Sequence, residues 1–111
     1  MKALSALILS MFALAFQTQN VMAADNEVSL IIQNHQFQPN EIQIPVGKKI
    51  RLIIDNRDAT PEEFESYELN REKVIGANSK GSLFIGPLKP GRYPFFGDFN
   101  QKTAHGVIIV K

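Results

Sequence analysis

The sequence predicts an all-β fold, a single domain that follows a leader segment. Short apolar–polar alternations with a period of two recur along the chain, and turn-forming residues separate them. Such runs at a spacing of roughly 8–12 residues are typical of a sandwich or barrel. No window shows a convincing helical stripe, although residues 61–68 have the composition for one short turn of helix.

The first 23 residues have the features of a signal peptide. Lys2 supplies a positive start, residues 3–16 are apolar apart from two serines, and a polar segment follows. A membrane span needs about 20 apolar residues, more than this stretch provides. We therefore expect cleavage after Ala23 or Ala24, and a domain over residues 24–111 that is exported to the periplasm without membrane insertion.

The expected strands share an alternation of aliphatic side chains with more polar ones. Ile50, Leu52 and Ile54, for example, alternate with residues that include Arg51 and Asp55, the pattern of a strand with one wet face. Proline and glycine close the runs at Pro45-Val46-Gly47, Pro87, Pro90-Gly91 and Gly97-Asp98. We expect strands over residues 28–33, 42–46, 50–55, 82–87, 92–96 and 106–110.

Composition argues against several classes of function. Without Lys2 the chain carries 11 basic and 11 acidic residues, whereas a nucleic-acid partner favours a basic surface. There is no cysteine, and all three methionines lie in the leader, so the exported domain has no sulfur ligand for a metal. The sequence has no glycine-rich phosphate loop and no cue that pairs a serine with a histidine. It therefore carries no signature of a hydrolase or transferase.

Several segments resemble the cupredoxin family, over essentially all of residues 24–111. Phe37-x-Pro39-x-x-Ile42-x-Ile44-Pro45-x-Gly47 resembles the opening of a cupredoxin, and residues 106–110 its last strand. Residues 56–66, which end in Glu62-Glu63-Phe64-Glu65-Ser66, fall where cupredoxins place the first metal-ligand loop. Residues 88–99, which end in Phe95-Phe96-Gly97-Asp98-Phe99, resemble the approach to the second. The resemblance implies a Greek-key β-sandwich of about seven strands.

The segments at residues 62–66 and 95–99 are the more specific part of this resemblance. They are similar to a subgroup of periplasmic cupredoxin-like proteins associated with bacterial iron-uptake permeases. This similarity implies a periplasmic metal-handling protein whose partners are iron-uptake components or an iron permease. Copper or iron is then the expected metal ion.

The resemblance also implies where a metal site lies and which kind it is not. A blue-copper centre takes two histidines, a cysteine and a weak axial methionine. The matched loops place Glu62 at the first histidine, Gly97 at the cysteine and Asn100 at the second histidine, with the axial position on Ala104 or His105. A thiolate–copper electron carrier is therefore excluded. The iron-associated subgroup usually has a histidine at the place of Asn100.

The remaining candidate ligands are hard donors. Carboxylates with one or two imidazoles suit iron, Cu(II), zinc or manganese and lack the soft donors that hold Cu(I). In a strand, Glu62 lies on one face and Glu63 and Glu65 on the other, so Glu63 joins Glu62 only where the chain turns. An acidic run is also commonly a solvated face. The predicted metal ligands are His35, Glu62, Glu63, Asp98, Asn100 and His105.

Two functions stay open at this point. The first is metal handling in iron uptake through His35, Glu62 and His105, with at most an accessory enzymatic role in oxidising ferrous iron. The second is a degenerate, metal-free cupredoxin that acts as a protein-binding module, which the asparagine at position 100 favours. Phe95 and Phe96 cannot both be buried in a regular strand with one wet face. At least one aromatic side chain is therefore expected at the surface as a docking patch.

Overall fold

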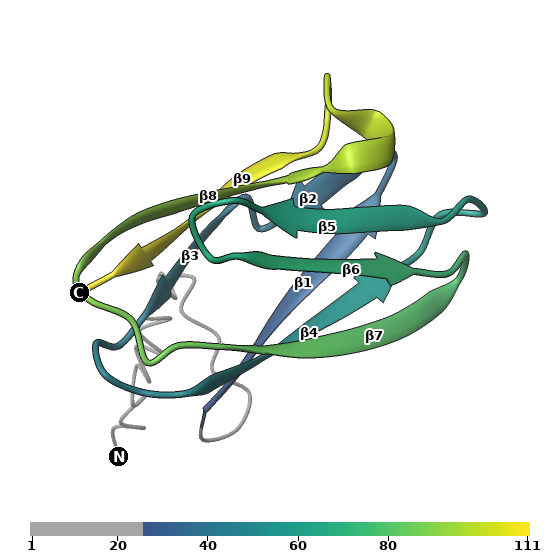
Figure 1. Ribbon diagram of the computed structural model, residues 1–111. Coiled ribbons are helices and arrows are strands. Elements are labelled where there is room, and N and C mark those ends of the chain that lie inside the picture. Colours follow the sequence, from purple (N-terminus) through teal and green to yellow (C-terminus); the bar gives the residue numbers. More distant parts are fainter. Residues whose placement is uncertain (1–25) are drawn as a thin grey trace, which may run out of the picture.

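The structure, a computed structural model, describes residues 26–111 and consists of two packed β-sheets (Figure 1). It confirms the predicted all-β single domain, with nine strands in place of about seven; the predicted signal peptide lies outside the described residues. The strands are β1 (Glu27–Gln33), β2 (Gln36–Gln38), β3 (Glu41–Ile44), β4 (Ile50–Asn56), β5 (Glu62–Ser66), β6 (Arg71–Ile75), β7 (Ser79–Ile85), β8 (Gly91–Gly97) and β9 (His105–Val110).

Both sheets are mixed. One has the strand order β2-β1-β4-β7 and the other β3-β9-β8-β5-β6. The pairs β1–β4 and β3–β9 are parallel, and the other pairs are antiparallel. The chain therefore crosses between the sheets several times, and segments far apart in sequence become neighbours in one layer (Figure 1).

The core lies between the sheets and is built from the inward-facing side chains of both. Leu30 from one sheet and Ile108 from the other are fully buried, and burial of such a side chain stabilises the fold by about 1.5–3 kcal/mol. Phe37, Phe64 and Phe95 pack together in this core with ring centroids 5.0 to 6.2 Å apart. Phe37 meets the other two rings edge to face, a favoured aromatic arrangement.

The structure corrects the suggestion of a helical turn over residues 61–68. Residues 62–66 form β5, which pairs with β6 on one side and with β8 on the other. Backbone pairing on both edges outweighs the weak helical preference of this acidic segment. The helical part of the described chain is η1 (Asp98–Asn100), a 3₁₀ turn after β8, and none of residues 26–111 form a helix long and apolar enough to cross a membrane.

A close approach at Gly106, where β9 passes the ring of Phe95, generates a stability prediction. A Cβ atom at Gly106 would overlap the Phe95 ring and lie 2.9 Å from the backbone oxygen of Asn40. Because overpacking a core contact typically costs about 1–3 kcal/mol, Gly106→Ala should lower the free energy of unfolding by about that amount in urea denaturation. The matched control is Gly76→Ala, whose Cβ would meet Ser79 Oγ at 3.6 Å. An equal loss in both variants would contradict the steric explanation.

Candidate functional site

Pairing of β5 with β8 brings together the two segments that carry the specific part of the sequence resemblance. Phe64 pairs with Gly97 and Glu65 with Phe96. The η1 turn follows β8 directly and contacts β5. Residues 62–66 and 95–99 therefore lie side by side, and β5 presents one row of side chains to the core and the other to solvent.

On the inner side, Glu62 lies beside Gly97, Asn100 and Ala104. Glu62 is 1% exposed. Its Oε1 accepts hydrogen bonds from the backbone N–H groups of Glu63 at 3.0 Å and Phe99 at 2.9 Å, and its Oε2 accepts one from Asn100 Nδ2 at 2.5 Å. A Cβ atom at Gly97 would lie 2.7 Å from both Glu62 Cδ and Ala104 Cβ. With Ala104 as the axial position, the four matched cupredoxin ligand positions meet at one point, whereas His105, the alternative, is exposed.

The residues at this point do not fit a copper ion of the blue-copper kind. They offer one carboxylate and one amide, and no imidazole, thiolate or thioether. Both oxygens of the carboxylate already accept hydrogen bonds, and the amide nitrogen of Asn100 faces Glu62. The carboxylate fills the space beside Gly97 and Ala104. We derive no metal chemistry from this interior position.

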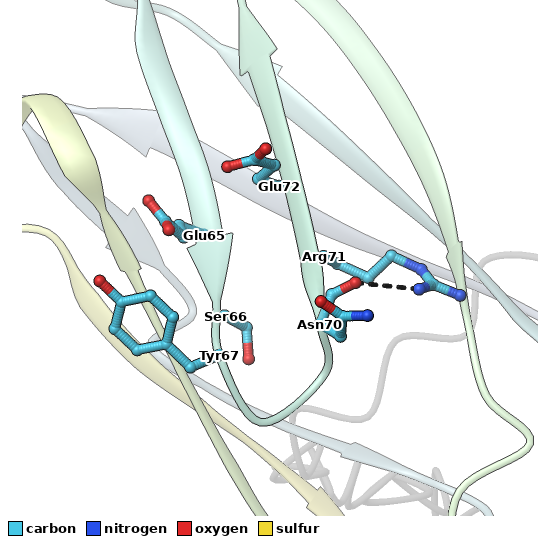
Figure 2. Close-up of a pocket in the computed structure, with 6 residues that line it drawn as sticks. All are labelled: Glu65, Ser66, Tyr67, Asn70, Arg71 and Glu72. Carbon is cyan, nitrogen blue, oxygen red and sulfur yellow. Dashed lines mark hydrogen bonds between the residues drawn. The ribbon is translucent and has the colours of Figure 1, made fainter.

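On the outer side, three carboxylates converge on the β5–β6 ribbon, and we call Glu63, Glu65 and Glu72 the outer acidic cluster. One carboxylate oxygen from each lies within 4.8 Å of the others. The cluster follows from register, because Glu65 pairs directly with Glu72 and strand alternation places Glu63 on the same face. Figure 2 shows Glu65 and Glu72 on these two neighbouring strands, with Tyr67 at the end of β5.

No ion pair within the described residues neutralises the outer acidic cluster; the three that form are His35–Asp58, Arg51–Glu27 and Arg57–Asp55. Arg71 is close in sequence, but its Nε donates to the backbone oxygen of Phe84 at 3.0 Å and its Nη1 to that of Asn70 at 3.0 Å (Figure 2). Partial desolvation raises the pKa of the Glu63 carboxyl, and the nearby carboxylates of Asp98, Glu65 and Glu72 raise that pKa further.

The two histidines belong to neither the Glu62–Asn100 contact nor the outer acidic cluster. His35 sits in the β1–β2 turn, where its backbone N–H and that of Asn34 donate to the Asp58 carboxylate, and its Nδ1 lies 3.6 Å from Asp58 Oδ2. It also borders a shallow hollow of about 500 Å³ along residues 98–103. His105 is exposed and pairs across strands with Phe96 on the outer face of its sheet.

The six predicted ligands therefore do not form one group. The structure joins Glu62 to Asn100 by a hydrogen bond and places Asp98 close enough to Glu63 to raise its pKa. His35 borders the same hollow as Asp98 and Asn100, whereas His105 stands separately. Two residues of the outer acidic cluster, Glu65 and Glu72, are absent from the predicted set. Strand alternation was the signal available for Glu65, which shares a face with Glu63, whereas Glu72 depends on the β5–β6 register.

The structure shows which of the two phenylalanines of β8 is buried, a choice that the sequence left open. Phe95 is buried at 2% exposure, whereas Phe96 faces outward and its ring lies 5.4 Å from that of Tyr67. Tyr67 and Phe99 are exposed. An aromatic pair therefore borders the outer acidic cluster on the side of β8.

Comparison with known proteins gives the same fold. The chain matches the family described as Cupredoxin-like domain over residues 5–110. It is 51% identical over 84 residues to Uncharacterized protein RP394 of Rickettsia prowazekii (strain Madrid E), covering 76% of this chain and 67% of that protein.

Two solved structures are similar in fold at low sequence identity. One is the metal-binding domain of the Cu(I)-exporting P-type ATPase CopA of Streptococcus pneumoniae D39 with Cu(I), at a TM-score of 0.68 and 17% identity, covering 77% of this chain and 84% of that one. The other is a reduced amicyanin mutant, at a TM-score of 0.63 and 18% identity, covering 79% of this chain and 85% of that one.

The raised pKa of Glu63 predicts a pH-dependent effect of Glu63→Gln. An acid whose pKa is higher in the folded state gives stability that is full below its unfolded pKa and is lost as pH rises through the folded value. Removal of this charge should therefore raise the melting temperature at about pH 7, and the gain should shrink as pH falls below the ordinary value of 4.5. Circular dichroism melts of both proteins across this range provide the measurement.

The control is Glu68→Gln, which removes an equal charge from an exposed residue outside the outer acidic cluster. We expect no comparable gain in that variant. The same pH-dependent rise in both would show that net charge, and not the local convergence of carboxylates, is responsible.

Proposed function

Because this chain belongs to the cupredoxin-like domain family, we propose that it is an exported metal-handling protein of bacterial iron uptake. In this proposal it works in the periplasm with iron-uptake components or an iron permease. It holds a hard metal ion, iron or Cu(II), through the outer acidic cluster and not at the cupredoxin copper position. Its enzymatic role, where it has one, is limited to assisting the oxidation of ferrous iron.

One observation carries the proposal. The two segments that resemble the iron-associated subgroup, residues 62–66 and 95–99, are joined by β5–β8 pairing. They contribute Glu63, Glu65 and Asp98, and β6 adds Glu72. Partial desolvation raises the pKa of the Glu63 carboxyl, and repulsion from these neighbouring carboxylates raises it further. A bound cation would relieve that repulsion and use each carboxylate as a ligand.

The donor chemistry indicates which ions suit the cluster. Carboxylate oxygens are hard ligands that suit Mg, Ca and Mn. Between the oxidation states of iron and copper they favour Fe(III) and Cu(II), whereas Cu(I) favours thiolate and thioether donors. Residues 26–111 contain no sulfur. The CopA domain with Cu(I) is therefore a guide to the fold and not to the ion. An all-oxygen donor set stabilises the oxidised form of either metal, so it would favour transfer of an electron from bound Fe(II) to an external acceptor such as dioxygen.

Metal titration of the domain tests the outer acidic cluster directly. Calorimetry with Cu(II), and with Fe(II) under anaerobic conditions, should show one-to-one binding. Glu65→Gln and Glu72→Gln should each weaken it about tenfold or more, since loss of one ligand worth about 1.4 kcal/mol changes the dissociation constant tenfold. Glu68→Gln is the matched control, because Glu68 is exposed and lies outside the cluster, and it should bind as the unaltered protein does. Equal affinity in all four proteins would contradict the proposed site.

The second candidate function is a metal-free protein-binding module. The interior Glu62–Asn100 contact favours it, because the family's copper position holds no metal ligand set, and so does the exposed Tyr67 ring beside Phe96. A ligand at a hundredfold excess over its dissociation constant stabilises a domain by about 2.7 kcal/mol. Melting temperatures unchanged by Cu(II), Fe(III) and Zn(II) would select this function over metal handling.

A further inference from the structure

Glu62 is the one buried acidic side chain in residues 26–111. A carboxylate removed from water without compensating partners costs several kcal/mol, so its environment must supply donors. No basic side chain pairs with it within the described residues. The position therefore needs a structural explanation, and the outer acidic cluster does not provide one.

Three N–H groups supply that compensation. Glu63 and Phe99 donate from the backbone to Oε1, and Asn100 donates from its side chain to Oε2. Hydrogen bonds to an ionised carboxylate are stronger than those between neutral groups. No buried side-chain nitrogen or oxygen in the described residues lacks a partner. Both oxygens of the buried carboxylate thus have hydrogen-bond partners within the protein.

The donors come from two segments that lie far apart in the sequence. Glu62 and Glu63 begin β5, whereas Phe99 and Asn100 lie in η1. Phe99 is 37 residues and Asn100 is 38 residues after Glu62. The backbone oxygen of Asn100 also accepts hydrogen bonds from Thr103 at 3.2 Å and Ala104 at 2.9 Å. Asn100 therefore holds the β8–β9 loop in shape while its side chain fastens that loop to β5.

These contacts lie at the point where the matched cupredoxin ligand positions meet. We propose that the Glu62 carboxylate and the Asn100 amide replace the metal ion as the noncovalent cross-link between β5 and the β8–β9 loop, so that this interior position binds no metal. In a copper protein the ion joins these loops through its ligands; here a hydrogen-bonded pair joins them. The proposal does not depend on metal binding by the outer acidic cluster.

A double-mutant cycle tests the cross-link through thermal unfolding of the domain. Glu62→Ala leaves the N–H donors of Phe99 and Asn100 without an acceptor, and Asn100→Ala leaves Glu62 Oε2 without its donor. Each variant should therefore lower the melting temperature by roughly 5–20 °C. Because the two side chains act as one unit, the double variant should lose clearly less than the sum of the two shifts. Glu62→Gln keeps an acceptor for both backbone N–H groups, and a rotated Asn100 amide can face its NH₂ group, so it should recover most of the loss.

The control cycle combines Asn100→Ala with Ser66→Ala. Ser66 is equally buried on β5, and its hydroxyl donates to Pro94 O at 2.7 Å and accepts from Leu69 N–H at 3.2 Å, away from η1. Its effect should add to that of Asn100→Ala. Additive shifts in the Glu62–Asn100 cycle, or no recovery in Glu62→Gln, would overturn the cross-link.

Titration with Cu(II) alone tests the second half of the proposal. Glu62→Gln and Asn100→Ala should match the unaltered protein in affinity within about twofold, whether that protein binds at the outer acidic cluster or not at all. An affinity reduced about tenfold or more in Glu62→Gln, about 1.4 kcal/mol, would place Glu62 among the ligands and overturn the proposal. Failure of the outer acidic cluster is a different result, because it appears as unchanged binding in Glu65→Gln and Glu72→Gln.

Discussion

The pairing of β5 with β8 is the interaction on which both carboxylate groups depend. Two residue pairs define it, Phe64 with Gly97 and Glu65 with Phe96. This register turns Glu62 toward η1 in the interior and sets Glu65 beside Phe96 on the surface. A slip of one residue would reverse the two faces of β5. It would bury Glu65 without donors and carry Phe64 out of its contacts with Phe37 and Phe95, so the core itself enforces the register.

Neighbouring glutamates on β5 consequently have opposite physical situations. Glu62 is enclosed, and three N–H groups complete its hydrogen bonding. Glu63 faces outward, where partial desolvation and then the like charges of Asp98, Glu65 and Glu72 raise its pKa. A carboxylate that already accepts three hydrogen bonds has a high cost of rearrangement around a metal, whereas the outer carboxylates would lose repulsion on binding a cation. The two faces of β5 therefore differ: the inner carboxylate has a structural role, and the outer carboxylates are the ones open to a cation.

Periodicity predicts most of the fold, and long-range register determines most of the site. The run at residues 50–55 corresponds to β4, Ile50–Asn56, because its apolar face is continuous. Periodicity does not predict β6, because residues 71–74 are all exposed and only Ile75 is buried. Alternation alone places Glu63 with Glu65, but Glu72 joins them only through the β5–β6 register. The Glu62–Asn100 contact spans 38 residues, and no local rule predicts it.

Gly97 shows why the interior position cannot be converted to a copper site by single substitutions. Any side chain there meets Glu62 Cδ and Ala104 Cβ at 2.7 Å, so a cysteine requires Glu62 to leave first. Removal of Glu62 alone leaves the N–H groups of Phe99 and Asn100 without their acceptor, which is costly. The absence of a side chain at Gly97 therefore leaves the space that the Glu62 carboxylate fills. The interior is therefore a closed structural unit, and the metal site that we propose lies on the face of β5 that is open to solvent.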